Sequence, residues 1–207
     1  MGKHYVPKFY LRGFTQADRF AVFDKEARRW FYSQPKSVAN EVDLWPDELE
    51  AHVTKNIEEP AKEVIELLRK KAMVTQEERH RLAHYITFLW KRVPAGRKRV
   101  RDYTPAVADQ VKDELNIALD ELVREDGTVV ELVEQRRTEI ASYIEKIKLE
   151  RPASIWHGSL TVESEIGVGQ GIAGMNWTVL HTSEPRYFAS DNPVFFFQND
   201  GVGNVTS

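Results

Sequence analysis

The chain has 207 residues, of which 42% are hydrophobic and 29% charged, a composition typical of a globular protein with one domain or at most two small ones. It contains no cysteine, which excludes disulfide scaffolds, thiolate metal sites and thiol catalysis. The net charge of −3 gives no overall argument for nucleic-acid binding. No stretch approaches the ~18 apolar residues of a membrane span, and the start of the chain does not resemble a secretory signal, so we expect a cytoplasmic protein without membrane contact.

The first forty residues predict a β-hairpin. Residues 19–24 (RFAVFD) and 29–33 (RWFYS) are short aromatic-rich runs, joined by the polar stretch 25–28. A hairpin this hydrophobic is not stable alone in water, so we expect it to pack on the rest of the chain.

From residue 47 to residue 150 the hydrophobic period is that of helices, and about four are expected. Pro60 interrupts the first apolar stripe and indicates a kink or the first turn of another helix. Thr75 and Glu78 predict a capping box, and residues 94–96 (PAG) end the helix that follows. Thr104-Pro105 predicts the start of a third helix with Val111, Leu115, Leu119 and Leu122 facing inward. A fourth helix is expected to follow Asp126-Gly127, with an inward stripe of Val133, Ile140, Ile144 and Ile147.

Beyond Ile155 the hydrophobic residues have the spacing of β-strands, as they do near the start of the chain. Residues 177–181 and 187–189 predict a second hairpin, and residues 194–197 predict a further strand. The glycine motif at residues 169–174 matches a dinucleotide-binding pattern, but a strand follows where a helix is required, so we interpret it as a flexible loop. The sequence thus predicts one α+β domain over residues 1–207, with the helices packed on a small antiparallel sheet built from both chain ends.

Two boxes near the ends of the chain carry a family resemblance. Residues 4–14 (HYVPKFYLRGF) and 190–194 (SDNPV), with Arg92-Val93-Pro94 at a helix end between them, resemble a bacterial domain-of-unknown-function family. The resemblance covers nearly the whole chain, and it implies a shared fold but no reaction. Members of that family continue past the SDNPV strand, so the resemblance implies that a C-terminal segment of the family domain is absent here.

The same boxes hold the candidate catalytic residues. His4 has a side chain suited to proton transfer near neutral pH. Arg92 lies at the edge of an apolar stripe, where an unpaired guanidinium is costly, so we expect it to pair with a carboxylate or to bind an anion. Asp191 is the favoured partner, and the other carboxylates expected nearby are Glu41 and Glu50. The open alternative is a structural ion pair that ties helix to sheet.

Residues 91–101 (KRVPAGRKRVR) contain six cations and no acid. Such a run can simply complement a helix C-terminus, but it can also attract a phosphate-bearing partner. We therefore expect Arg97, Lys98 and Arg99 to steer an anionic substrate. Tyr5, Arg12 and Asn192 complete the expected substrate-binding residues. His80 and His84 have the helical spacing of metal ligands, but Arg79 and Arg81 flank them and no third ligand follows, so we expect neither a metal nor a cofactor.

Two functions remain open from these residues. The first is a nuclease-like hydrolase of a phosphodiester in RNA or DNA, in a defence or mobile-element setting, with His4, Arg92 and Asp191 in one cleft. The second is a non-catalytic binding or regulatory module, in which the same cluster is structural and the basic run binds a partner. The expected partner is nucleic acid or another phosphate-bearing ligand.

Overall fold

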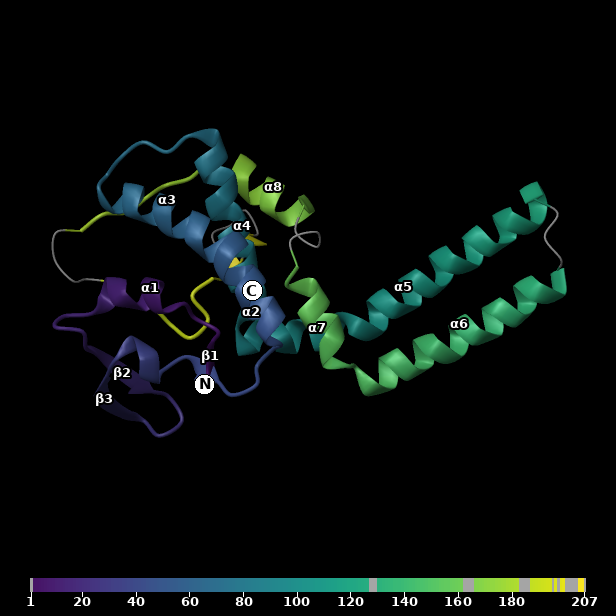
Figure 1. Ribbon diagram of the computed structural model, residues 1–207, viewed down its shortest axis with the longest axis horizontal. Helices are drawn as coiled ribbons and strands as arrows, with labels where there is room; N and C mark the ends of the chain where they lie inside the picture. Colours follow the sequence, from purple (N-terminus) through teal and green to yellow (C-terminus); the bar gives the residue numbers. More distant parts are fainter. Residues whose placement is uncertain are drawn as a thin grey trace. The chain divides into compact units, whose positions relative to one another are not determined.

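The computed structural model describes residues 2–126, 130–161, 166–182, 187–194, 196, 198–199 and 205–206. The chain divides into two compact units: Met1–Gly96 with Ser159–Ser207, and Arg97–Gly158. Both are mainly helical, and the strands are short (Figure 1). None of the helices in the described part of the chain combines the length and hydropathy needed to cross a membrane.

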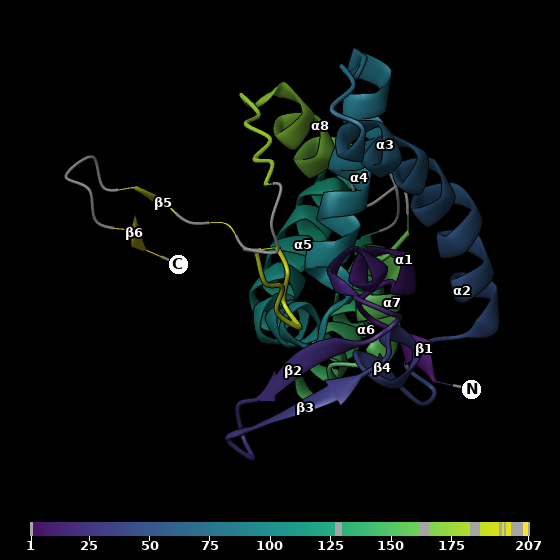
Figure 2. The same ribbon diagram turned by 90° about the vertical axis from the view of Figure 1, so that its left-hand side faces the viewer.

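The N-terminal strands pair with one another. β1 (Lys3–His4) lies antiparallel to β4 (Asn40–Glu41), and β2 (Phe20–Asp24) lies antiparallel to β3 (Arg29–Ser33) (Figure 2). The first predicted hairpin is therefore confirmed almost to the residue. The short helical turns of this region are α1 (Lys8–Leu11), η1 (Arg12–Phe14) and η2 (Pro35–Ser37).

The predicted sheet built from both chain ends is wrong. In the described C-terminal residues, β5 (Gln198–Asn199) pairs only with β6 (Val205–Thr206), and residues 176–182 and 187–194 form no strand. Trp177 shows the physical reason, because its indole donates to the Ile172 carbonyl at 2.8 Å and stacks under Arg79. The residues that follow it, 178–182, are exposed and pair with no strand in the described part of the chain. Residues 183–186 of the predicted hairpin, and residues 195 and 197 of the predicted strand, lie outside the described residues.

The helices of the first unit surround its core. They are α2 (Asp47–Val53), the π-helical segment η3 (Thr54–Glu58), α3 (Glu59–Arg69), α4 (Gln76–Arg92) and α8 (Ile166–Gly174). The predicted capping box is confirmed, because Thr75 Oγ1 accepts from the Glu78 amide at 3.2 Å and Glu78 Oε2 accepts from the Thr75 amide at 2.6 Å. Pro60 lies in the first turn of α3, one of its two predicted positions.

The interpretation of residues 169–174 as a flexible loop is wrong, because these residues lie in α8. This helix packs against α4 through buried Ala83, Ile172 and Ala173. A Cβ on Gly169 would lie 3.9 Å from Thr87 Oγ1, an ordinary van der Waals contact, so this part of α8 lies directly against α4. Packing against α4 therefore outweighs the low helix propensity of glycine.

The second unit is built on a helical hairpin. α5 (Pro94–Asp126) continues into this unit, α6 (Val130–Glu150) returns beside it, and α7 (Ala153–Ser159) follows (Figure 1). Arg137 binds Asp120, and Lys148 binds Asp109 at 2.8 Å, which fixes the antiparallel register. We refer to Arg97–Asp126 of α5 with α6 as the helical hairpin.

The predicted third helix start at Thr104 is wrong, because α5 begins ten residues earlier at Pro94 and passes through Pro105. The Thr104 hydroxyl does not cap a new helix but donates to the Val100 carbonyl one turn back, at 2.8 Å. The inward stripe predicted for this helix is also wrong in part, because Val111, Leu115 and Leu122 are exposed. On α6, the predicted burial of Val133 and Ile144 is confirmed.

Candidate functional site

Arg92, the last residue of α4, is buried at the centre of the N-terminal core, with 1% of its side chain exposed. Its Nη1 donates to Glu58 and its Nη2 donates to the backbone carbonyl of His4. The sequence analysis favoured Asp191 as the carboxylate partner, and this expectation is wrong, because the carboxylate bound to the guanidinium is that of Glu58.

Two aromatic rings complete the surroundings of Arg92. Its guanidinium carbon lies 4.8 Å from the centre of the Phe88 ring and 5.1 Å from that of Trp45. Both contacts are within cation–π range, and they strengthen when the site is dry. Arg92 thus joins α4, the π-helical segment, β1 and the loop before α2.

The π-helical segment explains how Glu58 reaches this position. It continues α2 without a break, and Pro60 then falls in the first turn of α3. A π turn adds a residue per turn and rotates the side chains that follow it. The carboxylate of Glu58 is only 19% exposed, so the pair is largely shielded from water.

His4 is half-buried next to this cluster. Burial and the charge of Lys8 lower the pKa of its imidazole below the usual 6.5, while contacts with the backbone of Pro35 and Lys36 act in the opposite sense. Its Nε2 is buried and has no hydrogen-bond partner among the described residues. A neutral imidazole with a vacant nitrogen is chemically able to accept a proton.

The two terminal boxes lie within electrostatic reach of each other. Burial raises the pKa of Tyr5, and the carboxylates of Asp191 and Glu41 raise it further. Asp191 itself is exposed, at a turn in which Ser190 Oγ donates to the Asn192 carbonyl at 2.7 Å. The side-chain oxygen of Asn192 is buried without a partner in the described part of the chain. Tyr5 therefore lies near both Glu41 and Asp191, while a common cleft of His4, Arg92 and Asp191 stays a prediction.

Glu50 and Arg12 are two further predicted residues. Glu50 accepts a 2.6 Å hydrogen bond from the indole of Trp45, whose ring lies beside the Arg92 guanidinium. Arg12 is exposed in η1.

The basic run is largely engaged within the protein. Lys91 donates to the Ser159 carbonyl at 3.1 Å, and Arg92 is enclosed as described. In the second unit, Arg97 lies over the Trp156 ring at 5.6 Å and Lys98 pairs with Asp102 at 2.6 Å. Burial lowers the pKa of Arg99. These contacts favour a structural role for much of the run over the predicted role in steering substrate.

The sequence analysis missed a second candidate surface, on the β2–β3 hairpin. Trp30 is 71% and Tyr32 is 70% exposed, and the register places Phe23 opposite Trp30 on the same face. The rings of Phe23 and Trp30 are 5.0 Å apart, and Arg19 lies 5.9 Å from the centre of the Tyr32 ring. We call Arg19, Phe23, Trp30 and Tyr32 the aromatic ribbon. The three consecutive aromatic residues 30–32 could have revealed it, had the hairpin not been expected to pack on the rest of the chain.

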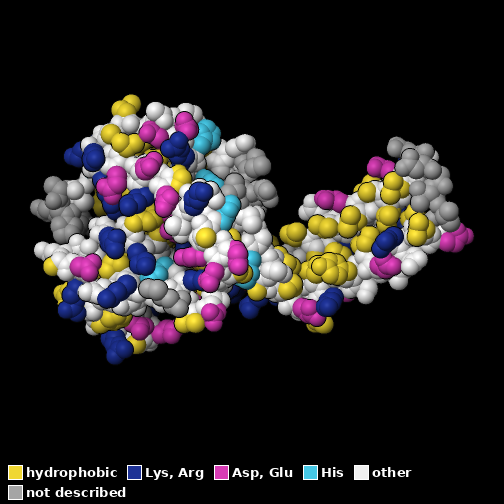
Figure 3. Space-filling view, in the orientation of Figure 1, with side chains coloured by type: hydrophobic (Ala, Val, Ile, Leu, Met, Phe, Trp, Pro, Cys, Tyr) yellow, Lys and Arg dark blue, Asp and Glu magenta, His cyan; other side chains and the backbone are white. Residues whose placement is uncertain are grey.

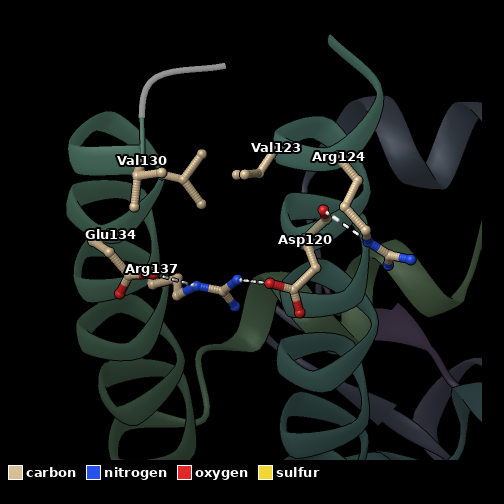
Figure 4. Close-up of a pocket in the computed structure, with 7 residues that line it drawn as sticks. Asp120, Val123, Arg124, Val130, Glu134 and Arg137 are labelled. Carbon is tan, nitrogen blue, oxygen red and sulfur yellow. Dashed lines mark hydrogen bonds and ion pairs between the residues drawn. The ribbon is translucent and has the colours of Figure 1, made fainter. Parts of the chain in front are cut away.

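A pocket of about 380 Å³ lies near the end of the helical hairpin, between α5 and α6 (Figure 4). Arg137 crosses it to Asp120 and also pairs with Glu134 at 3.0 Å. Because its charged groups satisfy one another, this pocket is an ordinary gap between helices. It contains none of the catalytic or substrate-binding residues predicted from the sequence.

The described residues contain no group of three or more His, Asp or Glu side chains that could hold a metal ion. The expectation that no metal takes part stays a prediction.

A family model described as "Protein of unknown function (DUF4238)" matches residues 3–207. The predicted resemblance to a domain-of-unknown-function family is thereby confirmed for the family as a whole, while the individual boxes are not tested by the match. No curated protein and no solved structure matches the chain.

Proposed function

The chain belongs to the DUF4238 family, and we propose that it is a non-catalytic module that binds single-stranded nucleic acid through the aromatic ribbon. The observation that carries this proposal is the exposure of Trp30 and Tyr32 on one face of a two-stranded ribbon. Large aromatic side chains are normally buried, and exposed pairs of them mark binding surfaces.

The spacing of the rings suits stacked bases. Trp30 and Tyr32 are two residues apart on β3, so their side chains leave the same face about 7 Å apart. Each ring can then take the face of a different base, as in other proteins that bind single strands. A duplex keeps its bases stacked on one another, so we expect a preference for single strands.

The charges around the ribbon suit a phosphate backbone. Residues 19–33 contain four Lys or Arg and two Asp or Glu, although the whole chain is acidic. The side chains of Arg19, Lys25, Arg28 and Arg29 are exposed. Asp24 is already engaged, because its Oδ1 accepts the turn amides of Glu26 and Ala27, both at 3.0 Å. Phosphate contacts from these cations would make binding weaken with salt.

The enclosure of Arg92 supports the non-catalytic part of the proposal. A guanidinium that stabilises a reacting phosphate has to reach it, whereas this one is bound to Glu58 and the His4 carbonyl between two rings. We therefore assign Arg92 a structural role.

The test is binding of a fluorescently labelled single-stranded oligonucleotide of about twelve nucleotides, followed by anisotropy at several salt concentrations. Removing a stacked ring costs about 1–3 kcal/mol, so Trp30→Ala and Tyr32→Ala should each weaken binding about tenfold or more. Phe188→Ala is the matched control, because Phe188 is an aromatic residue of the same unit and is 95% exposed outside the ribbon.

Two results would overturn the proposal. One is the absence of saturable binding at low salt. The other is an equal loss of affinity in Phe188→Ala, which would mean that any exposed aromatic side chain contributes nonspecifically.

A second candidate function, the phosphodiester hydrolase in a defence or mobile-element setting, rests on His4. Its unpartnered Nε2 and its lowered pKa suit a general base, and the adjacent Tyr5 lies near Glu41 and Asp191. The same burial that encloses Arg92 also covers this nitrogen, so a substrate would have to displace its neighbours to reach it. Incubation of the protein with RNA, DNA and nucleotides decides between the two candidates. Turnover that is lost in both His4→Gln and Asp191→Asn would replace the binding module by the hydrolase.

A further inference from the structure

The helical hairpin has one apolar face that neither of its helices covers. On α5 the exposed residues recur at intervals of four, four and seven, and on α6 two large side chains join them: Val107, Val111, Leu115, Leu122, Leu132 and Tyr143. Figure 3 shows hydrophobic side chains gathered along the hairpin on the side that faces the viewer. We call these six residues the hairpin face.

The contacts between the helices show that the hairpin face is a distinct side of the hairpin. At 100° per residue, Asp109, Asn116 and Asp120 lie on one side of the α5–α6 seam, where they bind Arg137 and Lys148. Buried Ala108, Val133 and Ile144 fill the seam itself. The hairpin face lies on the other side of the seam, and on α6 exposed Arg136 lies between its two apolar residues.

We propose that a second copy of this chain covers the hairpin face, so that two hairpins form a four-helix bundle about a two-fold axis. This proposal goes beyond nucleic-acid binding and does not depend on it. A two-fold axis places the same surface on both copies, so an apolar face of matching width and length meets itself. Up-and-down bundles of this type are a common way to bury such faces.

The size of the hairpin face fits this partner. Val107 and Leu122 are fifteen residues apart, or about 22 Å along the helix axis. With a second helix alongside, the apolar side chains present roughly 500 Å², which is the size of the largest apolar patch on a typical monomer, and such patches are often binding surfaces. With its polar border, the face approaches the ~800 Å² per partner of a stable interface.

The charges at the border favour one arrangement. Exposed Glu114 and Glu121 border the face on α5. On α6, Lys146 and Glu139 border it, and Arg136, which pairs with Glu139 at 2.5 Å, lies on the face itself. A two-fold axis parallel to the helices places α6 of one copy over α5 of the other. The acidic side chains of α5 in one copy then meet the basic side chains of α6 in the other. An axis across the hairpin would place Glu114 and Glu121 over the same acids of the partner, which is unfavourable.

The experiment measures the molar mass of the full chain by light scattering or sedimentation over a range of micromolar concentrations. We expect twice the chain mass for the wild type, and a monomer or a dissociation constant at least tenfold higher for Leu115→Glu. Ile117→Glu is the matched control, because Ile117 is 58% exposed on α5 but points away from the hairpin face. It should remain a dimer, and circular dichroism should show that both variants keep their helices.

The charge arrangement has its own test. Glu121→Lys should weaken the dimer, and adding Arg136→Glu to it should restore part of the affinity. A wild type that is monomeric at every concentration would overturn the proposal, and so would a dimer that Leu115→Glu and Ile117→Glu weaken equally. Oligonucleotide binding by Leu115→Glu, measured in the same preparations, keeps this result separate from the function of the aromatic ribbon.

Discussion

At the scale of single residues, Arg92 shows how one side chain can organise a core. A buried guanidinium requires charge neutralisation and filled hydrogen-bonding positions, and here Glu58, the His4 carbonyl and two rings supply them. Arg92 was expected to be catalytic, but its bond to the His4 carbonyl holds the N-terminal box against α4.

We expect Arg92→Ala to destabilise the protein by about 3 kcal/mol or more, because it leaves the carboxylate of Glu58 shielded and unpaired. Urea unfolding of the purified variant measures this change. Arg69→Ala is the control, because the Arg69–Glu66 pair is about half exposed and such pairs contribute about 0–1 kcal/mol. Equal stability of Arg92→Ala and wild type would contradict the structural role.

His4 should make stability depend on pH. Burial lowers the pKa of its imidazole in the folded state, so below the unfolded value of about 6.5 the unfolded chain binds more protons. The stabilising contribution of neutral His4 is complete above that pH, and it declines as the pH falls through the lower folded pKa.

Melting temperatures measured between pH 7.5 and about 5 test this linkage. His4→Gln should flatten the acid side of the curve, whereas His181→Gln, at an exposed position, should leave its shape unchanged. A curve for His4→Gln that is parallel to that of the wild type would rule out His4 as the titrating group.

At the scale of elements, the sequence predicts those structures that are stabilised by contacts between residues close together in the chain. Thr75 and Glu78 satisfy each other's amides within one turn, and Asp24 organises the turn of the β2–β3 hairpin from inside that turn. Such elements require no distant partner, so the pattern of residues suffices to find them.

Elements that depend on distant partners were not predictable in this way. The glycine-rich α8 forms because its small residues fit against α4, far away in the sequence. Thr104-Pro105 has the pattern of a helix start, yet α5 continues through both residues. In the candidate site, the pairing of Arg92 with Glu58 depends on a π-helical segment that no residue pattern revealed.

At the scale of the whole molecule, the two units differ in how much they bury. Among the described residues, α4 alone contributes buried Leu82, Ala83, Tyr85, Phe88 and Leu89. The much longer α5 and α6 together contribute few buried apolar side chains, namely Ala108, Val133 and Ile144. Helices with little buried apolar surface open locally at a lower free energy than the core.

Hydrogen exchange should therefore separate the two units. We expect the amides of α5 beyond Ala108 and of α6 to exchange much faster than those of α4 when the protein is dilute. If two hairpins associate, raising the concentration should slow exchange in α5 and α6 but not in α4, and Leu115→Glu should abolish that dependence. Hairpin amides that are as protected as those of α4 at the lowest concentration would contradict this account, because the two helices would then be stable without any cover on the hairpin face.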